Sequence, residues 1–434
     1  MLKENKFLYY FSYSVFSFLI LVFTLSRTAT GIYIFNFRIG EYIVAVAVGV
    51  SIFYFLFKKK LNIYQNDLNF FMKIFLLIYF SFILSLITNL ENNFTTYIFR
   101  SSAYLWFIVF FIVGYFSSDN KFPLFKFYQF TRPLLILLYF YLTLDFFRSE
   151  EVSKFFLGFS DKFEPHKGSD VGMVYISTMF LNNRIFNEKY KFEYFFYVSA
   201  LFLPLFLFVS RAVFIASLFY FIFELINYFK KINKDYLKMG ISLILFLLIF
   251  FTSVVTVQDN EIVSDDYYED LVSLAQERNK IQYEKDGHLS FFWFSDGRIF
   301  SADGNLDWRL QIWQDVFYDL KNTNSLIFGY GYHETIPAMN LESRKGLDGL
   351  NEQVHNFLIN ILARGGLFQI ILYILLVISI IYFYYKNNKR FEILLFLLPI
   401  LFISFFDSSM ENAHFPLVFY FFLGIIYRSP SFKK

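Results

Sequence analysis

Three residues in the second half of the chain, Arg211, Arg309 and His355, have side chains suited to phosphate chemistry. A guanidinium group can bind a phosphate through two parallel hydrogen bonds, because its donors form a planar fork. An imidazole can accept a proton near neutral pH or donate a hydrogen bond to a phosphate. Simpler interpretations stay open: Arg211 as a cation that reaches toward lipid headgroups, Arg309 as the partner of a nearby acid, and His355 as an interfacial anchor.

Further residues in the same part of the chain are candidates for contacts with a substrate. Arg298 lies in "SDGRIF", where a solvated loop is the simpler interpretation. Arg364 should face protein, water or an anionic group, since a charge facing lipid at the bilayer centre would cost about 2.5–3.5 kcal/mol. His166 and Asp170 are weaker candidates. The full set of predicted substrate contacts is Arg298, Asn356, Arg364, Tyr330, His333 and Trp313.

Metal and thiol chemistry are disfavoured by the composition. The 434 residues include no cysteine, which excludes disulfides, thiolate metal ligands and cysteine nucleophiles. The run "SDDYYED" (Ser264–Asp270) could bind a divalent cation in principle, but adjacent carboxylates of this kind are more typical of a solvated face. We therefore expect a site without metal or cofactor, and no nucleic-acid partner.

The elements that must position these residues are apolar helices. Hydrophobic residues make up 57% of the chain and aromatic residues 24%, and the mean hydropathy is +0.46. A helix needs about 20 apolar residues to cross roughly 30 Å of hydrocarbon, and open strands would leave backbone groups unpaired in lipid. The sequence therefore predicts an all-α integral membrane protein. About twelve transmembrane helices are expected, at residues 7–25, 41–57, 69–89, 102–117, 132–147, 171–183, 193–209, 212–229, 239–256, 356–385, 391–406 and 413–427.

The distribution of lysine and arginine predicts the orientation of these helices. With twelve spans, the basic clusters fall on one side of the membrane together with both termini, and the positive-inside rule assigns that side to the cytoplasm. These clusters lie at residues 58–60, 121–126, 184–191, 230–238 and 386–390.

Three regions follow from this topology: membrane helices within 1–256, a large outer loop at 257–354, and membrane helices within 355–434. The loop has 18 acidic and 8 basic residues, a formal charge near −10, although the whole chain has +3. Because cations are the exception in the loop, an arginine there is a candidate for binding an anion.

The outer loop should be partly helical. "NLDWRLQIWQDVFYDL" (Asn305–Leu320) has apolar residues at helical spacing and predicts an amphipathic helix. "FGYGYHE" (Phe328–Glu334) contains glycines that permit turns. A second helix is expected to begin near Asn351 and to continue through "EQVHNFLINILARGG" into the tenth span. Its paired glycines, Gly365 and Gly366, would let another helix or a polyprenyl tail approach the backbone closely.

The order of four motifs resembles the superfamily of O-antigen polymerases and O-antigen ligases. "SRAVFIA" begins at Ser210, "WRLQIWQDVF" and "FGYG" follow in the outer loop, and "HNFLINILARGG" enters the next span and ends at Gly366. The resemblance implies a metal-independent glycosyltransferase of the bacterial inner membrane, with the outer loop and the active site in the periplasm. Such an enzyme moves glycan from undecaprenyl diphosphate to an acceptor hydroxyl. The functional residues that it implies are Arg211, Arg309 and His355.

The chemistry of these three side chains agrees with that implication. Departure of a diphosphate develops negative charge, which two preorganised arginines could stabilise. His355 could serve as general base for the acceptor hydroxyl or as a further phosphate contact, and the sequence leaves both roles open.

The acceptor distinguishes two activities within the superfamily. A polymerase extends another lipid-linked repeat, whereas a ligase delivers polymer to lipid A-core. Gln369 occupies a position where ligases often have threonine, and the "FGYG" turn and the long acidic loop favour a polymerase, with a ligase as the alternative. The expected partners are the lipid-linked donor and acceptor, the lipid bilayer and a chain-length regulator protein.

Two other classes are less favoured. A flippase or transporter would have polar groups near mid-membrane, whereas polarity in this chain collects in one outer loop. Metal-dependent oligosaccharyl and mannosyl transferases usually have acidic residues in the first outer loop, which here has none before Glu41.

Overall fold

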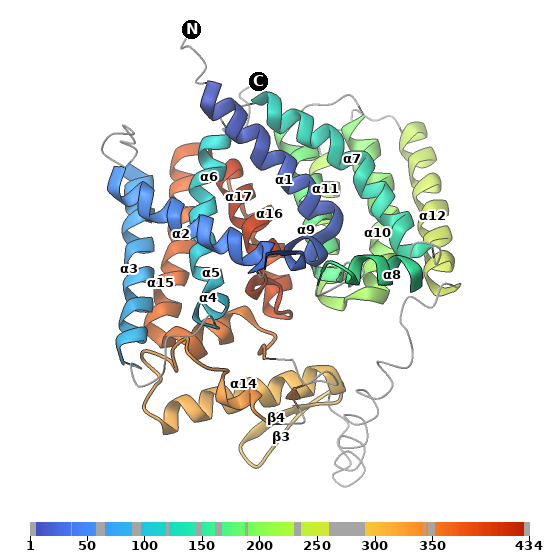
Figure 1. Cartoon of the computed structure of the whole chain (residues 1–434). Helices are drawn as coiled ribbons and strands as arrows, with labels where there is room; N and C mark the ends of the chain where they lie inside the picture. The colour runs from blue at the N-terminus through green and yellow to red at the C-terminus, as the bar shows by residue number, and fades with distance from the viewer. Residues whose placement is uncertain are drawn as a thin grey trace.

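The structure is a computed structural model that describes residues 6–35, 37–57, 66–88, 97–118, 121–144, 150–160, 167–186, 190–229, 236–259, 291–341, 344–345 and 352–428. A bundle of long helices forms most of the molecule, and one helix with a small hairpin covers one end of the bundle (Figure 1). The predicted solvated run Ser264–Asp270 and the candidate His166 lie outside the described residues.

The bundle is built from apolar helices in both halves of the chain. The helices before the outer loop are α1 (Lys6–Gly31), α2 (Ile39–Phe57), α3 (Asn66–Thr88), α4 (Tyr97–Ser101), α5 (Ala103–Trp106), α6 (Phe110–Ser117), α7 (Lys121–Thr143), α8 (Glu150–Leu157), α9 (Gly168–Phe180), α10 (Lys191–Val209), α11 (Arg211–Phe229) and α12 (Tyr236–Asp259). Those after it are α15 (Phe357–Asn388), α16 (Leu394–Phe405) and α17 (His414–Arg428).

Each of the twelve predicted spans overlaps helical structure, which confirms a mostly helical chain. Six helices within the described ranges are long and apolar enough to cross a membrane, and four shorter apolar helices accompany them. The six are Ser12–Gly31, Asp67–Ile87, Lys191–Val209, Arg211–Phe229, Gly240–Val257 and Phe357–Asn388. The number of crossings and their sidedness stay predictions.

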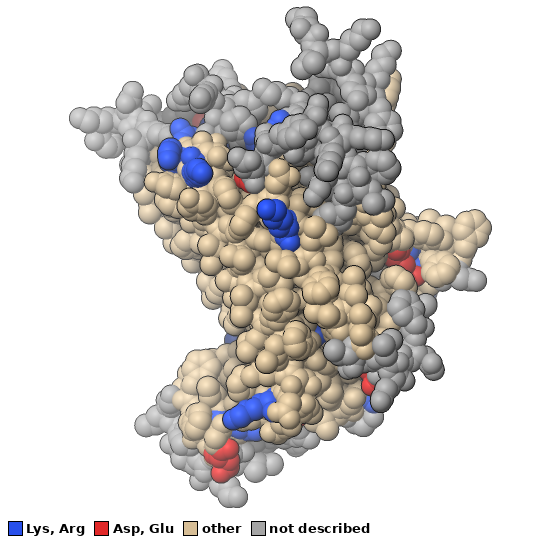
Figure 2. Space-filling model, turned by 90° about the vertical axis from the view of Figure 1, so that its left-hand side faces the viewer, with Lys and Arg blue, Asp and Glu red and all other residues tan. Residues whose placement is uncertain are grey.

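The surface pattern agrees with a membrane-embedded bundle. On the face drawn in Figure 2, the centre of the surface is largely uncharged, and the charged side chains that are visible lie toward the two ends and along one edge. Apolar side chains on α12 are exposed, including Leu248 at 59% and Phe251 at 62%. Exposed apolar surface of this extent is expected where lipid, rather than water, covers a helix.

Helix packing in the bundle depends on close backbone approach. A Cβ at Gly114 in α6 would lie 1.9 Å from the carbonyl oxygen of Phe421 in α17, and one at Gly424 would lie 2.0 Å from that of Phe111. Small residues let membrane helices approach in this way. This packing fixes α17, whose first residue takes part in the candidate site described below.

The outer loop contains the predicted amphipathic helix and a hairpin that the sequence did not reveal. The helix α14 (Gly304–Asn322) confirms the prediction for Asn305–Leu320. Strands β3 (Phe292–Ser295) and β4 (Arg298–Ser301) form an antiparallel pair that rests beside α14, and a second small pair joins β1 (Tyr33–Ile34) to β2 (Phe37–Arg38).

The second predicted helix begins later than expected. Residues 352–356 are not helical, and α15 starts at Phe357 rather than near Asn351. The reason is local: His355 has a positive φ of 54°, and the side chain of Asn356 caps the helix by accepting the N–H of Ile359 at 3.1 Å.

Gly366 breaks α15 with a positive φ of 68°, a conformation that glycine adopts at little cost. The outer loop pairs with the backbone at the break: the Phe368 N–H donates to Ile327 at 3.1 Å, and the Tyr330 N–H donates to Ala363 at 2.7 Å. A Cβ at Gly366 would lie 2.2 Å from the carbonyl oxygen of Ile327. The segment that approaches the glycine is thus the loop itself, rather than another helix or a lipid tail.

Candidate functional site

His355 is held in a constrained position between the outer loop and α15. The carbonyl of Val354, the preceding residue, accepts a hydrogen bond from the Trp313 indole at 2.8 Å, and Asn356, the following residue, caps α15. The left-handed backbone conformation of His355 is uncommon for a residue other than glycine. Such conformations cluster at functional sites, so the backbone itself makes His355 a candidate.

The helix α14 brings Trp308 and Arg309 to His355. The ring centroids of Trp308 and His355 are 5.2 Å apart in an edge-on arrangement. Arg309 donates from its guanidinium to the carbonyl of Phe406, just after the end of α16. One helix of the loop therefore contacts both membrane segments that border the histidine.

Burial and nearby cations keep the imidazole of His355 neutral. Burial is the largest cause of a fall in the pKa of His355 to about 3. Arg309, Lys167 and Arg27 lower this pKa further, whereas Asp407 opposes them. A histidine with such a pKa is uncharged at neutral pH, and an imidazole in this state has an unprotonated ring nitrogen that can accept a proton or a hydrogen bond.

Asp407 supplies a carboxylate to the same group of residues. Burial would raise the pKa of Asp407, but Lys167 and Arg27 contribute to a net lowering, so the group is ionised at neutral pH. Its carboxylate also accepts the N–H of Ser408 at 2.7 Å. We refer to His355, Arg309, Asp407, Lys167 and Arg27 as the His355 cluster.

A buried polar network positions Arg27 in this cluster. The preceding residue, Ser26, has a positive φ of 48° that kinks α1, and its hydroxyl donates to Asp170 at 2.6 Å. The other carboxylate oxygen of Asp170 lies 2.7 Å from Nε2 of His414. These contacts join α1, α9 and α17 beneath the cluster. Ser26 and His355 are thus two strained residues at one site.

Arg211 connects the start of α11 to the start of α14. Its guanidinium pairs with Asp303, whose other oxygen caps α14 by accepting the N–H of Leu306 at 2.9 Å. Burial would raise the pKa of Asp303, but the Leu306 N–H and Arg211 lower it on balance. Arg309 also acts on Asp303 electrostatically, so the structure brings the three predicted catalytic residues together through α14.

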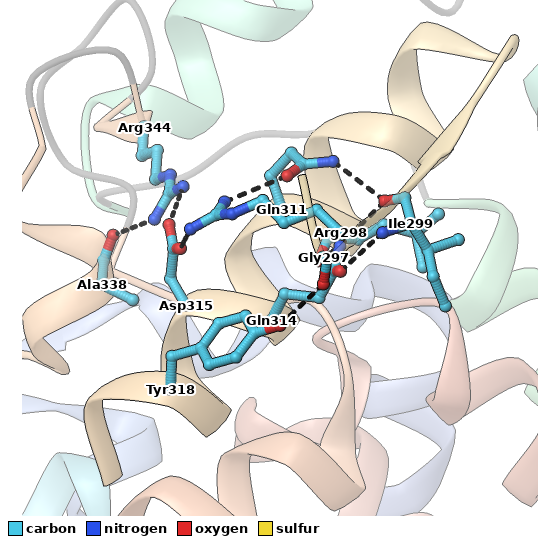
Figure 3. A network of polar contacts seen from close by, with 10 residues as sticks. Gly297, Arg298, Ile299, Gln311, Gln314, Asp315, Tyr318, Ala338 and Arg344 are labelled. Atoms are coloured by element: carbon cyan, nitrogen blue, oxygen red, sulfur yellow. Dashed lines mark hydrogen bonds and ion pairs between the residues drawn. The ribbon is translucent and has the colours of Figure 1, made fainter. Parts of the chain in front are cut away.

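Arg298 belongs to a different group of residues, the hairpin anchor, which we define as Arg298, Gln311, Asp315 and Arg344 (Figure 3). Arg298 donates to Gln311 at 3.1 Å and pairs with Asp315, and Arg344 pairs with the second oxygen of the same carboxylate. Arg344 also donates to the carbonyl of Ala338 at 2.7 Å. These contacts attach the hairpin and the following loop to α14.

Arg364 also contacts protein, as its predicted environment required. Its guanidinium donates to the hydroxyl of Tyr97 in α4 at 2.7 Å and to the carbonyls of Gly331 and Glu334. The ring nitrogens of the neighbouring His333 are buried and have no hydrogen-bond partner among the described residues. Arg364 therefore fixes the turn that follows Tyr330 against the membrane bundle.

Two of the other predicted substrate contacts, Trp313 and Asn356, border His355. Trp313 donates to the carbonyl of Val354, which precedes His355, and Asn356, which follows it, caps α15. The amide nitrogen of Asn356 is buried without a hydrogen-bond partner in the described part of the chain. Tyr330 donates from its hydroxyl to the carbonyl of Val316 in α14 at 3.4 Å. Binding of substrate by these residues stays a prediction.

Sequence reasoning missed Arg27, Lys167, Asp407 and His414. Arg27 lies in "SRTATG" at the end of the first span and Asp407 directly follows the eleventh, so polar residues at outer helix ends were the available signal. No group of three or more His, Cys, Asp and Glu side chains among the described residues could hold a metal ion. Metal independence of a reaction at this site stays a prediction.

The fold and the site define a multi-pass membrane protein with a cluster of cations around a neutral histidine. Residues 196–374 match the family model described as O-Antigen ligase. This match confirms, over these residues, the resemblance of the chain to the O-antigen ligase and polymerase superfamily, whose members are glycosyl-transferring enzymes. The matched range includes Arg211, Arg309 and His355. No curated protein matches the chain.

Proposed function

We propose that this protein is an O-antigen polymerase of the bacterial inner membrane, which joins undecaprenyl-diphosphate-linked repeats on the periplasmic side. The observation that carries the proposal is the His355 cluster, in which three cations and one carboxylate surround a neutral histidine. Such a site suits a donor that carries a diphosphate and an acceptor that must lose a proton.

The cations of the cluster have a role at the leaving group. When the bond between the anomeric carbon and the diphosphate oxygen breaks, the electron pair stays on the diphosphate. Arg309, with Arg27 and Lys167 nearby, would stabilise this charge in a site that is partly shielded from water. The cations would then take the place of a metal ion at the leaving group, and metal-independent transfer is therefore part of the proposal.

His355 is the proposed base for the acceptor. Its neutral ring nitrogen takes the proton of the acceptor hydroxyl as the hydroxyl oxygen bonds to the anomeric carbon. A base with a pKa near 3 would be weak, but the bound diphosphate offsets the cations that contribute to the low value. Donor binding would therefore raise the basicity of His355 in the complex that reacts. Direct displacement predicts inversion at the anomeric carbon, and a product that keeps the donor's configuration would contradict it.

Arg211 is proposed to act mainly on the position of α14. Its side chain is 80% exposed and pairs with Asp303, which caps the helix that carries Arg309. The exposed part of the guanidinium can also contact a phosphate that enters from the headgroup layer. The buried amide donor of Asn356 offers a further contact to substrate beside His355.

A ligase is the second candidate, because the matching family model is described as O-Antigen ligase. The two activities share the donor and differ in the acceptor. The "FGYG" turn and the long acidic loop are the features that favour the polymerase. A flippase or transporter is less favoured, since the charged cluster is built where the outer loop meets the helix ends.

The test uses the purified protein in liposomes with a lipid-linked repeat as the sole glycan. A polymerase extends the repeat on polyprenyl diphosphate in the absence of lipid A-core, whereas a ligase gives product only when lipid A-core is added. The Arg309→Ala variant, which should be inactive, is the control for contaminating enzymes. Absence of transfer with either acceptor would contradict the proposed function.

A further inference from the structure

The hairpin β1–β2 and the helix α8 present large apolar side chains on the surface of the molecule. Phe35, in the turn of the hairpin, is 89% exposed, and Phe155 in α8 is 68% exposed. We name the exposed apolar residues of these two elements the outer platform: Tyr33, Ile34, Phe35, Phe37, Phe155 and Leu157. Large apolar side chains that are exposed together mark a surface that binds another molecule or a membrane.

The conformation of the turn also indicates a role for Phe35. This residue has a positive φ of 50°, which is uncommon for a residue other than glycine and most costly for a bulky side chain. A glycine or an asparagine would form the same turn at a lower cost. The exposed phenyl ring therefore points to a function at the tip of the hairpin.

The hairpin and α8 form one unit, although they are distant in the sequence. The Tyr33 N–H donates to the carbonyl of Phe159, just after α8, at 3.1 Å. The hydroxyl of Ser160 donates to the carbonyl of Thr28, also at 3.1 Å. Thr28 directly follows Arg27. The outer platform is thus attached to the segment of α1 that supplies a cation to the His355 cluster.

Polar groups border the outer platform as they do at a boundary between membrane and water. The hydroxyl of Tyr33 accepts a hydrogen bond from Nε of Arg38 at 3.2 Å, and the hydroxyl of Tyr42 donates to the carbonyl of Ile34 at 3.0 Å. Tyrosine is enriched at this boundary, because its ring suits the acyl chains and its hydroxyl reaches polar groups. An arginine at the same depth extends its cation toward the headgroups along an apolar stem.

The place of the outer platform in the fold agrees with this boundary. The predicted topology assigns the loops that contain the two elements, 26–40 and 148–170, to the outer side of the membrane. In Figure 1, α8 runs crosswise to the long helices α10 and α12, as expected of a helix that lies in the plane of the membrane surface. Apolar side chains at this level meet lipid of the outer leaflet.

We propose that the outer platform inserts into the outer leaflet of the bilayer, at the boundary between headgroups and acyl chains. Insertion removes the aromatic side chains of the hairpin and α8 from water. Because the platform is attached beside Arg27, insertion also sets the depth of this cation relative to the lipid phosphates. The insertion itself does not depend on the reaction that the protein catalyses.

The test uses the absence of cysteine from the chain, which lets a probe be placed at one chosen position. Phe35→Cys and Phe294→Cys are each labelled with a nitroxide in the full-length protein, in vesicles of phosphatidylethanolamine and phosphatidylglycerol. Phe294 is the matched control: it is a 69% exposed aromatic residue of the β3–β4 hairpin, which lies beyond the end of the bundle (Figure 1). Collisions of the nitroxide with oxygen, which concentrates in hydrocarbon, and with a water-soluble nickel chelate measure its depth.

The ratio of oxygen to chelate collisions should be about tenfold higher for Phe35→Cys than for Phe294→Cys, because the acyl boundary excludes the polar chelate. Equal ratios would overturn the proposal. Disulfide-linked dimers of unlabelled Phe35→Cys, or a nitroxide protected from both reagents, would also overturn it, since protein would then cover the platform. Leu157→Cys in α8 repeats the measurement if Phe35→Cys does not fold.

A second measurement tests the link to Arg27. Phe35→Asp, which opposes insertion, should lower the rate of glycosyl transfer by about fivefold, because displacing a positioned cation slows a reaction. The control Phe294→Asp should keep the native rate. Equal rates for the two variants would overturn the link. The collision measurements need no activity, so a failure of the proposed function and a failure of insertion give different results.

Discussion

Helix α14 contributes to two groups of residues that use their arginines differently: it supplies Asp315 to the hairpin anchor and Arg309 to the His355 cluster. In the hairpin anchor, Asp315 receives Arg298 on one oxygen and Arg344 on the other, and neutral partners such as Gln311 take further donors. In the His355 cluster, burial and three nearby cations depress the pKa of a histidine, and Asp407 opposes them. The anchor uses its arginines to hold protein segments together, whereas the cluster places cations around a buried histidine, where we propose that an anionic substrate binds.

The largest expected effect is at Arg309. Replacing it with alanine should lower kcat by about 100- to 1000-fold, because a preorganised donor at the leaving group is lost. Arg309→Lys keeps the charge but loses the planar fork, and we expect an intermediate loss of about tenfold. Transfer rates in liposomes measure both variants. An alanine variant with near-native kcat would show that Arg309 does not belong to the catalytic site. The His355 cluster and the hairpin anchor would then no longer differ in the role of their arginines.

His355→Ala should lower kcat by about 100-fold, the scale of a lost general base. His355→Asn separates chemistry from backbone, since asparagine tolerates the left-handed conformation and should keep the native melting temperature. In the protein without substrate, the low pKa of His355 means that the imidazole stays neutral as the pH falls. The native kcat/KM should therefore stay level from about pH 7.5 to about pH 5.5, where an ordinary histidine would become protonated. A fall in kcat/KM with a midpoint near the ordinary histidine pKa would contradict the low pKa of His355.

Asp303 offers a change that weakens the link between Arg211 and α14. Asp303→Asn keeps an N-cap but removes the ion pair, and we expect transfer to fall by about fivefold, since exposed pairs contribute little. Asp303→Ala removes cap and ion pair together and should have the larger effect on both transfer and melting temperature. If Asp303→Asn lost activity as fully as Arg309→Ala, Asp303 would have a direct role in the reaction.

The smallest effect on activity is expected at the hairpin anchor. Arg298→Met should lower the melting temperature by about 2 °C and leave kcat within about twofold, because Asp315 keeps Arg344 as a partner. Thermal unfolding in detergent and transfer in liposomes measure the two effects. A loss of activity without a change in melting temperature would instead make Arg298 a substrate contact, as its sequence context predicted.

Local patterns predicted several elements correctly. The helical spacing in Asn305–Leu320 matches α14, and each predicted span overlaps a helix, because both signals depend on the periodicity and length of apolar runs. The start of α15 was mistaken by several residues, since a left-handed His355 and a capping Asn356 end the extended segment. Nothing in the spacing of apolar residues signals a positive φ at a histidine.

Residue type alone also selected Arg211, Arg309 and His355, because guanidinium and imidazole groups suit phosphate and proton chemistry wherever the fold places them. Only the tertiary structure separated Arg298 and Arg364, which attach loop segments to α14 and to the bundle, from the cations that act on the pKa of His355. It also added Arg27 and Asp407, which are far from His355 along the chain. The physical reason is that the burial of a residue such as His355, the charges around it and its pKa depend on residues from several helices. A linear sequence does not state which helix ends meet.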